Sequence, residues 1–94
     1  MHAIGMDIEY DPNKNRKNIA SHGISFAEVD AVFFDAMAIT VQDNDHNEQR
    51  MITLGMDATG RIIVVCYAWR GSNIRVISAR KAEPHERRIY EGKR

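Results

Sequence analysis

Residues 61–82, RIIVVCYAWRGSNIRVISARKA, constrain the fold more than any other stretch of this chain. Residues 62–69 are apolar on both alternating faces, which is typical of a central strand covered on both sides of its sheet. Residues 70–73 predict a hairpin loop. The return strand over residues 74–79 carries Arg75 and leads into Arg80 and Lys81. Arginine suits forked contacts with phosphate, so this hairpin is the first candidate for a functional surface.

The length of 94 residues, with 44% hydrophobic and 28% charged residues, predicts a single domain over residues 1–94. No apolar run is long enough to span a membrane, and the N-terminal residues lack the layout of a signal peptide. The single cysteine, Cys66, excludes an internal disulfide and is interpreted as a small buried filler. We therefore expect a cytoplasmic protein without a membrane partner.

The formal net charge of zero conceals two halves of opposite sign. Residues 1–47 hold three basic and eight acidic groups, a balance of −5, and residues 48–94 hold ten basic and five acidic groups, a balance of +5. This asymmetry indicates that the second half faces a polyanion and the first half another partner. Two solvated surfaces without a partner would give the same pattern.

The order of the predicted elements is β-α-α-β-β-β-β-α, and tight loops between the last four strands predict an antiparallel meander. Asp11-Pro12 predicts the start of the first helix, and the capping box from Ser25 to Glu28 predicts the start of the second. The fold class is therefore α+β, with helices packed against the sheet. The predicted strands cover residues 6–10, 38–42, 51–56, 62–69 and 74–79, and the first and last helices cover residues 12–21 and 84–91.

Several short motifs occur in a fixed order along the chain. They are Tyr10-Asp11-Pro12-Asn13-Lys14 with Asn18, His22-Gly23-Ile24-Ser25-Phe26, Phe34-Asp35, Glu48-x-Arg50, Arg75-Val76-Ile77-Ser78-Ala79-Arg80-Lys81-Ala82, Glu86-Arg87 and Tyr90. In this order and spacing the chain resembles the BrnT family of toxins from bacterial type II toxin–antitoxin systems. Tyr10 departs from the family pattern, in which Trp is common, but it remains aromatic.

The resemblance implies a compact fold related to the RelE-type ribonucleases and an RNA-cleaving activity that inhibits translation. It also implies a cognate antitoxin of the BrnA type with a ribbon-helix-helix DNA-binding module, in a heterotetramer of two toxins and two antitoxins. The complex would bind operator DNA through the antitoxin alone. The few apolar residues of the first and last helices predict that the antitoxin packs across the sheet and these helices.

Metal-independent RNA cleavage needs cationic donors on the phosphate, a base near the ribose 2′-OH and an acid for the leaving oxygen. Arg75 and Arg80 are the candidates for the phosphate, although surface ion pairs would also explain them. They have opposite parity on the predicted strand, so a bulge, a twist or the strand end is needed to bring both to one side. Arginine cannot exchange protons near neutral pH, so His22 or Glu48 is the candidate acid or base. His22 is equally compatible with binding loop carbonyls, and Glu48 with a cross-strand salt bridge.

Further substrate contacts are expected from Arg50, Lys14 and Lys81, although a solvated lysine on the helix face would also explain Lys14. Trp69 either stacks on a base or belongs to the core. For Tyr67 a core position is the better interpretation. The histidines lack paired metal-ligand spacing and no glycine-rich phosphate loop precedes a helix, so neither a metal nor a cofactor is expected. A non-catalytic module, acting as a co-repressor by holding a DNA-binding partner, is the alternative to the ribonuclease.

Overall fold

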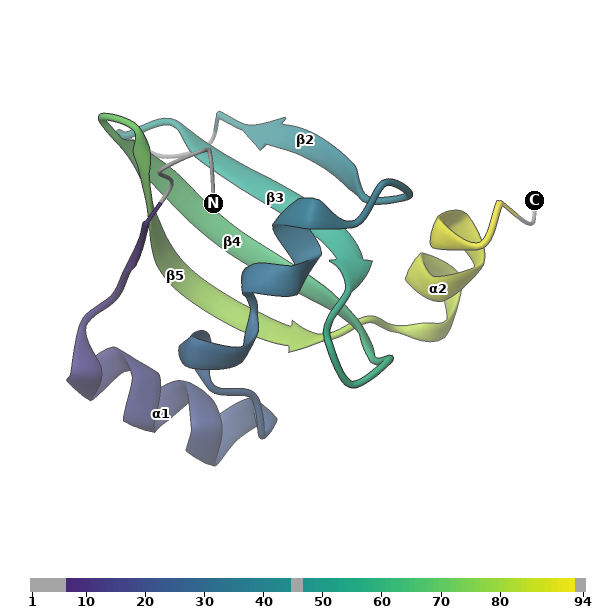
Figure 1. Ribbon diagram of the computed structural model, residues 1–94, viewed down its shortest axis with the longest axis horizontal. Helices are drawn as coiled ribbons and strands as arrows, with labels where there is room; N and C mark the ends of the chain where they lie inside the picture. Colours follow the sequence, from purple (N-terminus) through teal and green to yellow (C-terminus); the bar gives the residue numbers. More distant parts are fainter. Residues whose placement is uncertain (1–6, 45–46, 93–94) are drawn as a thin grey trace, which may run out of the picture.

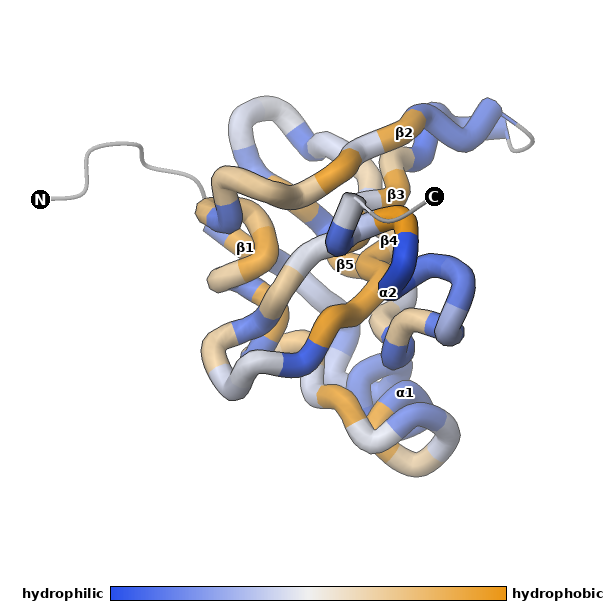
Figure 2. The backbone as a smooth tube through the Cα atoms, turned by 90° about the vertical axis from the view of Figure 1, so that its right-hand side faces the viewer, coloured by the Kyte–Doolittle hydropathy of each residue, from blue (hydrophilic) through white to orange (hydrophobic). Residues whose placement is uncertain are grey.

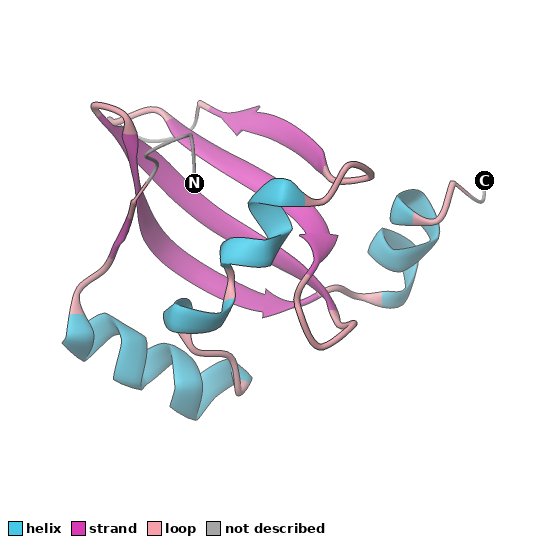
Figure 3. Ribbon diagram, in the orientation of Figure 1, coloured by secondary structure: helices cyan, strands magenta, loops and turns pink. Residues whose placement is uncertain are grey.

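The computed structural model describes residues 7–44 and 47–92, which form an α+β fold around a five-stranded sheet (Figures 1 and 3). The helical segments are α1 (Pro12–His22), η1 (Phe26–Glu28), η2 (Asp30–Phe34) and α2 (Pro84–Tyr90). The strands are β1 (Ile8–Glu9), β2 (Ile39–Asp43), β3 (Arg50–Met56), β4 (Ile62–Arg70) and β5 (Asn73–Lys81). Met6, the first residue of the predicted first strand, lies outside the described residues.

The strand order across the sheet is β1-β5-β4-β3-β2. Strands β2 to β5 pair with their sequence neighbours in antiparallel fashion, which confirms the predicted meander. The short β1 pairs in parallel with β5 at the other edge of the sheet, a position that the sequence did not specify. Strand β4 therefore lies in the middle, as its two apolar faces indicated.

The predicted second helix forms as two short 3-10 helices, η1 and η2, instead of one α-helix. The capping box is present, with Ser25 and Glu28 bonding each other's backbone, but the chain turns at Val29. Short tight turns suit this segment because it has to bring one apolar side chain after another onto the sheet. Phe26, Val29 and Val32 are all buried.

The main core lies between η1, η2 and one face of the sheet, which we call the core face (Figure 1). Tyr67 is buried in it, as expected. In Figure 2 the hydrophobic colour follows the strands, whereas α1 is largely hydrophilic. The buried cluster of the core face consists of Ile24, Phe26, Val29, Val32, Ile63, Val65, Tyr67, Ile74, Val76 and Ala79.

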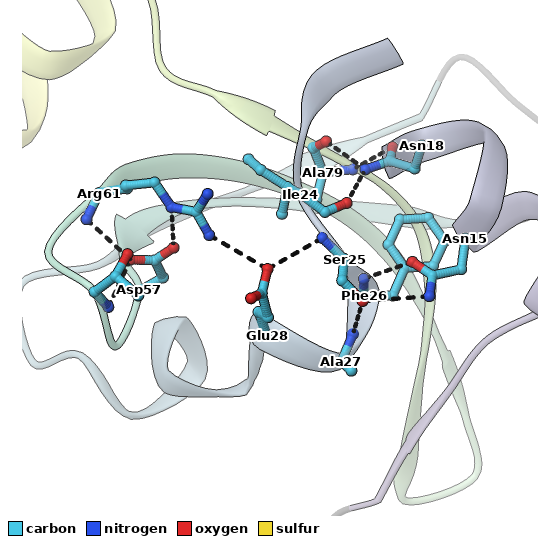
Figure 4. A network of polar contacts seen from close by, with 11 residues as sticks. Asn15, Asn18, Ile24, Ser25, Phe26, Ala27, Glu28, Asp57, Arg61 and Ala79 are labelled. Carbon is cyan, nitrogen blue, oxygen red and sulfur yellow. Dashed lines mark hydrogen bonds and ion pairs between the residues drawn. The ribbon is translucent and has the colours of Figure 1, made fainter. Parts of the chain in front are cut away.

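Helix α1 is attached to the sheet by a buried polar side chain, Asn18 (Figure 4). Its Nδ2 donates to the carbonyl oxygens of Ile24 and Ala79, both at 2.8 Å, and its Oδ1 accepts from the N–H of Ala79 at 3.2 Å. The amide thus bonds Ala79 as a neighbouring strand would, and it covers the edge of β5 beyond β1. This contact explains how a helix with few apolar residues is held.

The opposite side of the sheet, which we call the α2 face, is only partly covered. Helix α2 lies beside a small cluster of Leu54, Val64 and Ala82. Tyr90 of α2 donates from its hydroxyl to Asp35 Oδ2 at 2.6 Å, and this bond raises the pKa of Tyr90 to about 12.

Among the described residues, no helix has the length and apolar character to cross a membrane.

Candidate active site

A β-bulge decides where the two candidate arginines lie. Arg75 pairs with Ala68 and Arg80 with Val64, and the register between β4 and β5 shifts near Cys66. Ile77 is the extra residue of the bulge. It has no partner on β4, so the alternation of side chains shifts by one residue and Arg75 and Arg80 point to the same side of the sheet. Both side chains therefore belong to the α2 face. They are separated by four residues of β4, or about 13 Å along the strand.

Arg50 joins Arg75 at the same end of the α2 face. It lies one residue before the Met51–Tyr67 pair, level with Ala68, so the two arginines flank Ala68 from the neighbouring strands. Two strand spacings separate them, about 10 Å. The next row on this face contains Cys66 opposite Ser78, so small side chains form the floor between the two guanidinium groups.

Both arginines retain free donors. The Nε of Arg50 is buried and has no hydrogen-bond partner. Within residues 7–44 and 47–92, no hydrogen bond or ion pair engages the guanidinium of Arg75. The neighbouring carboxylate of Glu9 accepts instead from Asn73 Nδ2 at 3.0 Å. An anion beside Arg75 would therefore meet donors that no described protein group occupies, next to the buried and unpaired Nε of Arg50.

Glu48 lies two residues before β3, ahead of the strand end that carries Arg50. Burial raises the pKa of the Cys66 thiol; the charge of Arg50 opposes this effect, and the charges of Asp43 and Glu48 add to it. Glu48 and Arg50 thus both act electrostatically on a residue of the α2 face.

Arg80 is already engaged by an acidic residue that the sequence analysis did not select. Its Nη1 and Nη2 donate to the two carboxylate oxygens of Glu86 at 2.8 and 2.9 Å, with side-chain exposures of 39% for Arg80 and 19% for Glu86. The guanidinium lowers the pKa of Glu86 to about 2. The pair anchors α2 to β5, and a phosphate would have to displace Glu86 to use both donors of Arg80.

His22 and Lys14 lie apart from the arginines, in a pocket of about 230 Å³ beside α1. Among the described residues, no hydrogen bond or ion pair joins His22 to Arg75 or Arg80. Lys81 pairs with Ile63 and Trp69 with Ile74, so both belong to the core face. The structure therefore brings Arg50, Arg75 and Arg80 to the α2 face, with Glu48 two residues before Arg50, and leaves Lys81 and Trp69 on the core face and His22 and Lys14 in the α1 pocket.

A groove of about 250 Å³ lies on the α2 face beside Arg80, whose strand partner Val64 and ion-pair partner Glu86 both line it. The sequence analysis did not identify it, because it forms only when α2 comes to lie beside β2, β3 and β4. His85 and Glu86 line its α2 side, which brings a histidine near the Arg80–Glu86 pair. Its other lining residues are Ile39, Val41, Ile52, Leu54, Val64 and Ile89.

Comparison with known proteins identifies the family. Residues 10–86 match the family model described as "Ribonuclease toxin, BrnT, of type II toxin-antitoxin system". The chain belongs to the BrnT family. The crystal structure of the Brucella abortus ribonuclease toxin BrnT is similar, with a TM-score of 0.67 and 30% sequence identity over 83% of this chain and 97% of that one. No curated protein sequence matches the chain.

Family membership makes the position of the BrnT-like motifs informative. Asn18 bonds β5, and Asp35 accepts from Tyr90, so residues of separate motifs bond each other or the backbone. Glu86 bonds Arg80 in the same way. Much of the motif set thus builds the scaffold, and Arg50 and Arg75 stand out because their donors remain free.

Proposed function

We propose that this BrnT family member is a metal-independent endoribonuclease that acts in the cytoplasm and inhibits translation. It cleaves RNA by attack of the ribose 2′-OH on the adjacent phosphate, so the nucleophile belongs to the substrate. The observation that carries the proposal is the Arg75 guanidinium, which no described group engages, facing the unpaired Nε of Arg50 across a floor of small side chains. Such donors stabilise the charge that develops on the phosphate.

Arg75 and Arg80 are the catalytic arginines of this proposal, and Arg50 binds the substrate beside Arg75. Lys14, Lys81 and Trp69 contact RNA outside the cleaved linkage. Since each cation near a phosphate releases counterions, RNA affinity should fall steeply with salt. Binding that is independent of salt would contradict a phosphate site on this surface.

Glu48 is the preferred base, because it precedes Arg50 by two residues at the strand end proposed to hold the phosphate. His22 remains the candidate acid if the RNA extends to the α1 pocket, which also contains Lys14 and Lys17. A comparison of pH–rate profiles for Glu48→Gln and His22→Gln would show which residue determines the acidic limb and which determines the basic limb of the profile. A profile unchanged in both variants would exclude both residues as proton-transfer groups.

The first experiment incubates the purified protein with RNA in the presence of a chelator. Cleavage that persists in chelator and is lost in Arg75→Ala supports the ribonuclease. The matched control is Arg88→Ala, which removes an exposed guanidinium from α2. Equal loss in both variants would show that overall charge, rather than the Arg50–Arg75 site, determines the rate.

The role of Arg80 requires a second comparison, because Glu86 occupies its donors. Glu86→Gln removes the competing charge but keeps the size of the side chain. If Arg80 binds phosphate, Glu86→Gln should retain or increase RNA affinity, whereas Arg80→Ala should decrease it. If Arg80 only anchors α2, the two variants should lose stability alike and show the same RNA affinity.

The antitoxin that the family implies is proposed to be of the BrnA type, with a ribbon-helix-helix module, in a complex of two toxins and two antitoxins. We place it on the α2 face, where the apolar groove lies beside Arg80 and on the same face as Arg50 and Arg75, so that an acidic and apolar segment would cover both. The toxin would contact operator DNA only through this partner. Hydrogen exchange should slow in β2, β3 and α2 when the antitoxin binds; protection confined to α1 would place it elsewhere. A fold related to the RelE-type ribonucleases is part of the same proposal.

The bidentate bond between Arg80 and Glu86 favours a second candidate function. If that bond is permanent, the protein is a non-catalytic module that holds a DNA-binding partner as a co-repressor. The purified chain would then leave RNA intact at every concentration, while it would still increase the affinity of its partner for operator DNA.

A further inference from the structure

A pocket of about 290 Å³ lies on the core face, between η2 and the sheet, away from the arginine site. Its volume is near the lower limit for small-ligand sites, and suits a single ring system. It opens beside Trp69, which is 50% exposed. The lining residues are Val32, Phe33, Asp35, Ala38, Thr40, Thr53, Tyr67, Trp69 and Ile74.

Three aromatic rings line this pocket. The ring centroids of Phe33 and Tyr67 are 4.9 Å apart and those of Tyr67 and Trp69 are 6.2 Å apart, with interplanar angles of 86° and 79°. The edge-to-face arrangement leaves ring surface of Phe33 and Trp69 that is not stacked on another ring. A flat ligand would therefore find aromatic surface to stack on.

A chain of three hydroxyl groups also lines the pocket. The Oγ1 atoms of Thr40 and Thr53 are 2.8 Å apart, and Thr53 Oγ1 is 2.9 Å from the Tyr67 hydroxyl oxygen. Three hydroxyl groups carry three protons, and two hydrogen bonds use two of them. The third proton is available at Thr40 or Tyr67, depending on the direction of the chain. The pocket can thus offer a donor or an acceptor to the edge of a ligand.

The pocket has no charge available for an ionic ligand. Asp35 is the only carboxylate among its described lining residues. Its Oδ2 accepts from Tyr90 and from the N–H of Met56, and its Oδ1 accepts from the N–H of Met37. The Tyr90 hydrogen bond, first, and the Met56 N–H lower the pKa of Asp35, so it remains an engaged anion. The chemistry fits a neutral planar ring with a polar edge.

We infer that this pocket binds one nucleobase of the RNA, an inference that rests on the proposed ribonuclease function. Trp69 and Ile74 pair on the core face, and the adjacent pair, Ala68 and Arg75, belongs to the α2 face. The pocket and the arginine site are thus back to back at one end of the sheet. An RNA strand that crosses this end, past Arg70, places a base against Trp69 and the neighbouring phosphate near Arg75. Single-stranded RNA is commonly read by such stacking with hydrogen bonds to the base edge.

The test uses fluorescence, because Trp69 is the single tryptophan of the chain. The probe is a short 2′-O-methyl oligoribonucleotide, which cannot be cleaved by 2′-OH attack, compared with an abasic oligonucleotide of equal length and charge. Trp69 emission should be quenched to saturation by the base-bearing probe and should stay unchanged with the abasic probe. Equal responses to the two probes would overturn the inference.

Two matched pairs of variants locate the bound base. Phe33→Leu should weaken quenching about five-fold or more, whereas Phe34→Leu, at the next residue and outside the pocket, should not. Tyr67→Phe should weaken it about 5- to 10-fold by removing the terminal hydroxyl, whereas Tyr10→Phe should not. Circular dichroism checks that each variant is folded. If all four variants bind like the original chain, the base binds elsewhere.

The fluorescence experiment distinguishes a failure of the base-binding pocket from a failure of the proposed ribonuclease activity. Arg75→Ala should decrease affinity and its salt dependence while the quenching at saturation persists, because the base still stacks. If the chain does not cleave RNA but Trp69 still responds to the bases, the pocket is supported and the nuclease is not. If N-acetyltyrosinamide quenches Trp69 and the oligonucleotide does not, the pocket takes an aromatic side chain of a protein partner, and the inference fails.

Discussion

Polar side chains on the core face and on the α2 face of the sheet differ in how fully they are hydrogen-bonded. On the core face, Asn18 uses both ends of its amide on backbone groups, and Thr53 bonds hydroxyls on either side. On the α2 face, Arg50 keeps a buried Nε without a partner and Arg75 keeps free donors among the described residues. A buried donor without a partner costs stability, so the Nε of Arg50 is consistent with a face that is completed by a ligand.

The apolar surface divides in the same way. The core face buries most of its hydrophobic side chains beneath η1 and η2, with Trp69 as the 50% exposed exception, whereas Val41 at the edge of the α2 face is 54% exposed. The difference teaches that the core face mainly stabilises the fold and leaves only the pocket beside Trp69 for a ligand, while the α2 face is open to partners over a wider surface. Substitutions on the core face should therefore affect unfolding first, and substitutions on the α2 face should affect activity first.

The largest expected effect is on the α2 face. Arg75→Ala should slow RNA cleavage by about 100- to 1,000-fold, as is typical when one donor to a developing negative charge is removed. The midpoint of urea unfolding should stay within experimental error, because no described group bonds this guanidinium. Single-turnover cleavage and urea titration measure the two quantities. A large loss of stability with normal cleavage would reverse the roles assigned to the faces.

The largest effect on stability is expected from Asn18→Ala on α1. It removes three hydrogen bonds and leaves backbone groups of Ile24 and Ala79 without partners, so the free energy of unfolding should fall by about 3 kcal/mol. Ser21→Ala on the exposed side of the same helix is the control. Equal unfolding midpoints for the two variants would show that the amide does not hold α1 to β5.

A smaller effect is expected at Tyr90, which joins α2 to the end of η2. Tyr90→Phe should lower the free energy of unfolding by about 1 kcal/mol through loss of the bond to Asp35. The bond raises the pKa of Tyr90 to about 12, so the difference between the two proteins should persist at neutral pH and disappear as the pH rises from 10 towards 12. A difference that persists above pH 12 would not come from this hydroxyl.

The smallest effect concerns acid. Arg80 lowers the pKa of Glu86 from 4.5 to about 2. The ion pair therefore stabilises the fold fully above pH 4.5, and this contribution is lost as the pH falls towards 2. Both groups are partly exposed, so solvent screening limits the stabilisation to about 0.5 kcal/mol. Unfolding of Glu86→Gln and of the original chain should differ at neutral pH and converge in acid. A constant difference across this range would exclude the ion pair as its cause.

The fold was largely predictable because its signals are local. The capping box at Ser25, the Asp11-Pro12 helix start and the two apolar faces of β4 each identify an element from neighbouring residues alone. The exception is the second helix, which the sequence predicts as one segment. The need to place Phe26, Val29 and Val32 on the sheet divides it into two 3-10 turns, and that requirement arises only from tertiary packing.

The candidate site was predictable as a set of residue types but not as an arrangement. Arg75 and Arg80 share a face only because Ile77 is inserted in the pairing of β5 with β4, and alternation along the sequence predicts the opposite. Likewise, Glu86 meets Arg80 only after α2 folds back onto the sheet. These contacts depend on the strand register and on the path of the loop before α2. The periodicity of the sequence predicts neither of them.

The bonds of Asn18 to Ala79 also affect how this molecule can associate with others. By occupying the N–H and C=O of β5 beyond the two-residue β1, the amide closes that side of the sheet to a further chain. Strand β2 is then the long border still open to main-chain pairing. A second protein that extends this sheet would have to align its backbone with Ile39–Asp43.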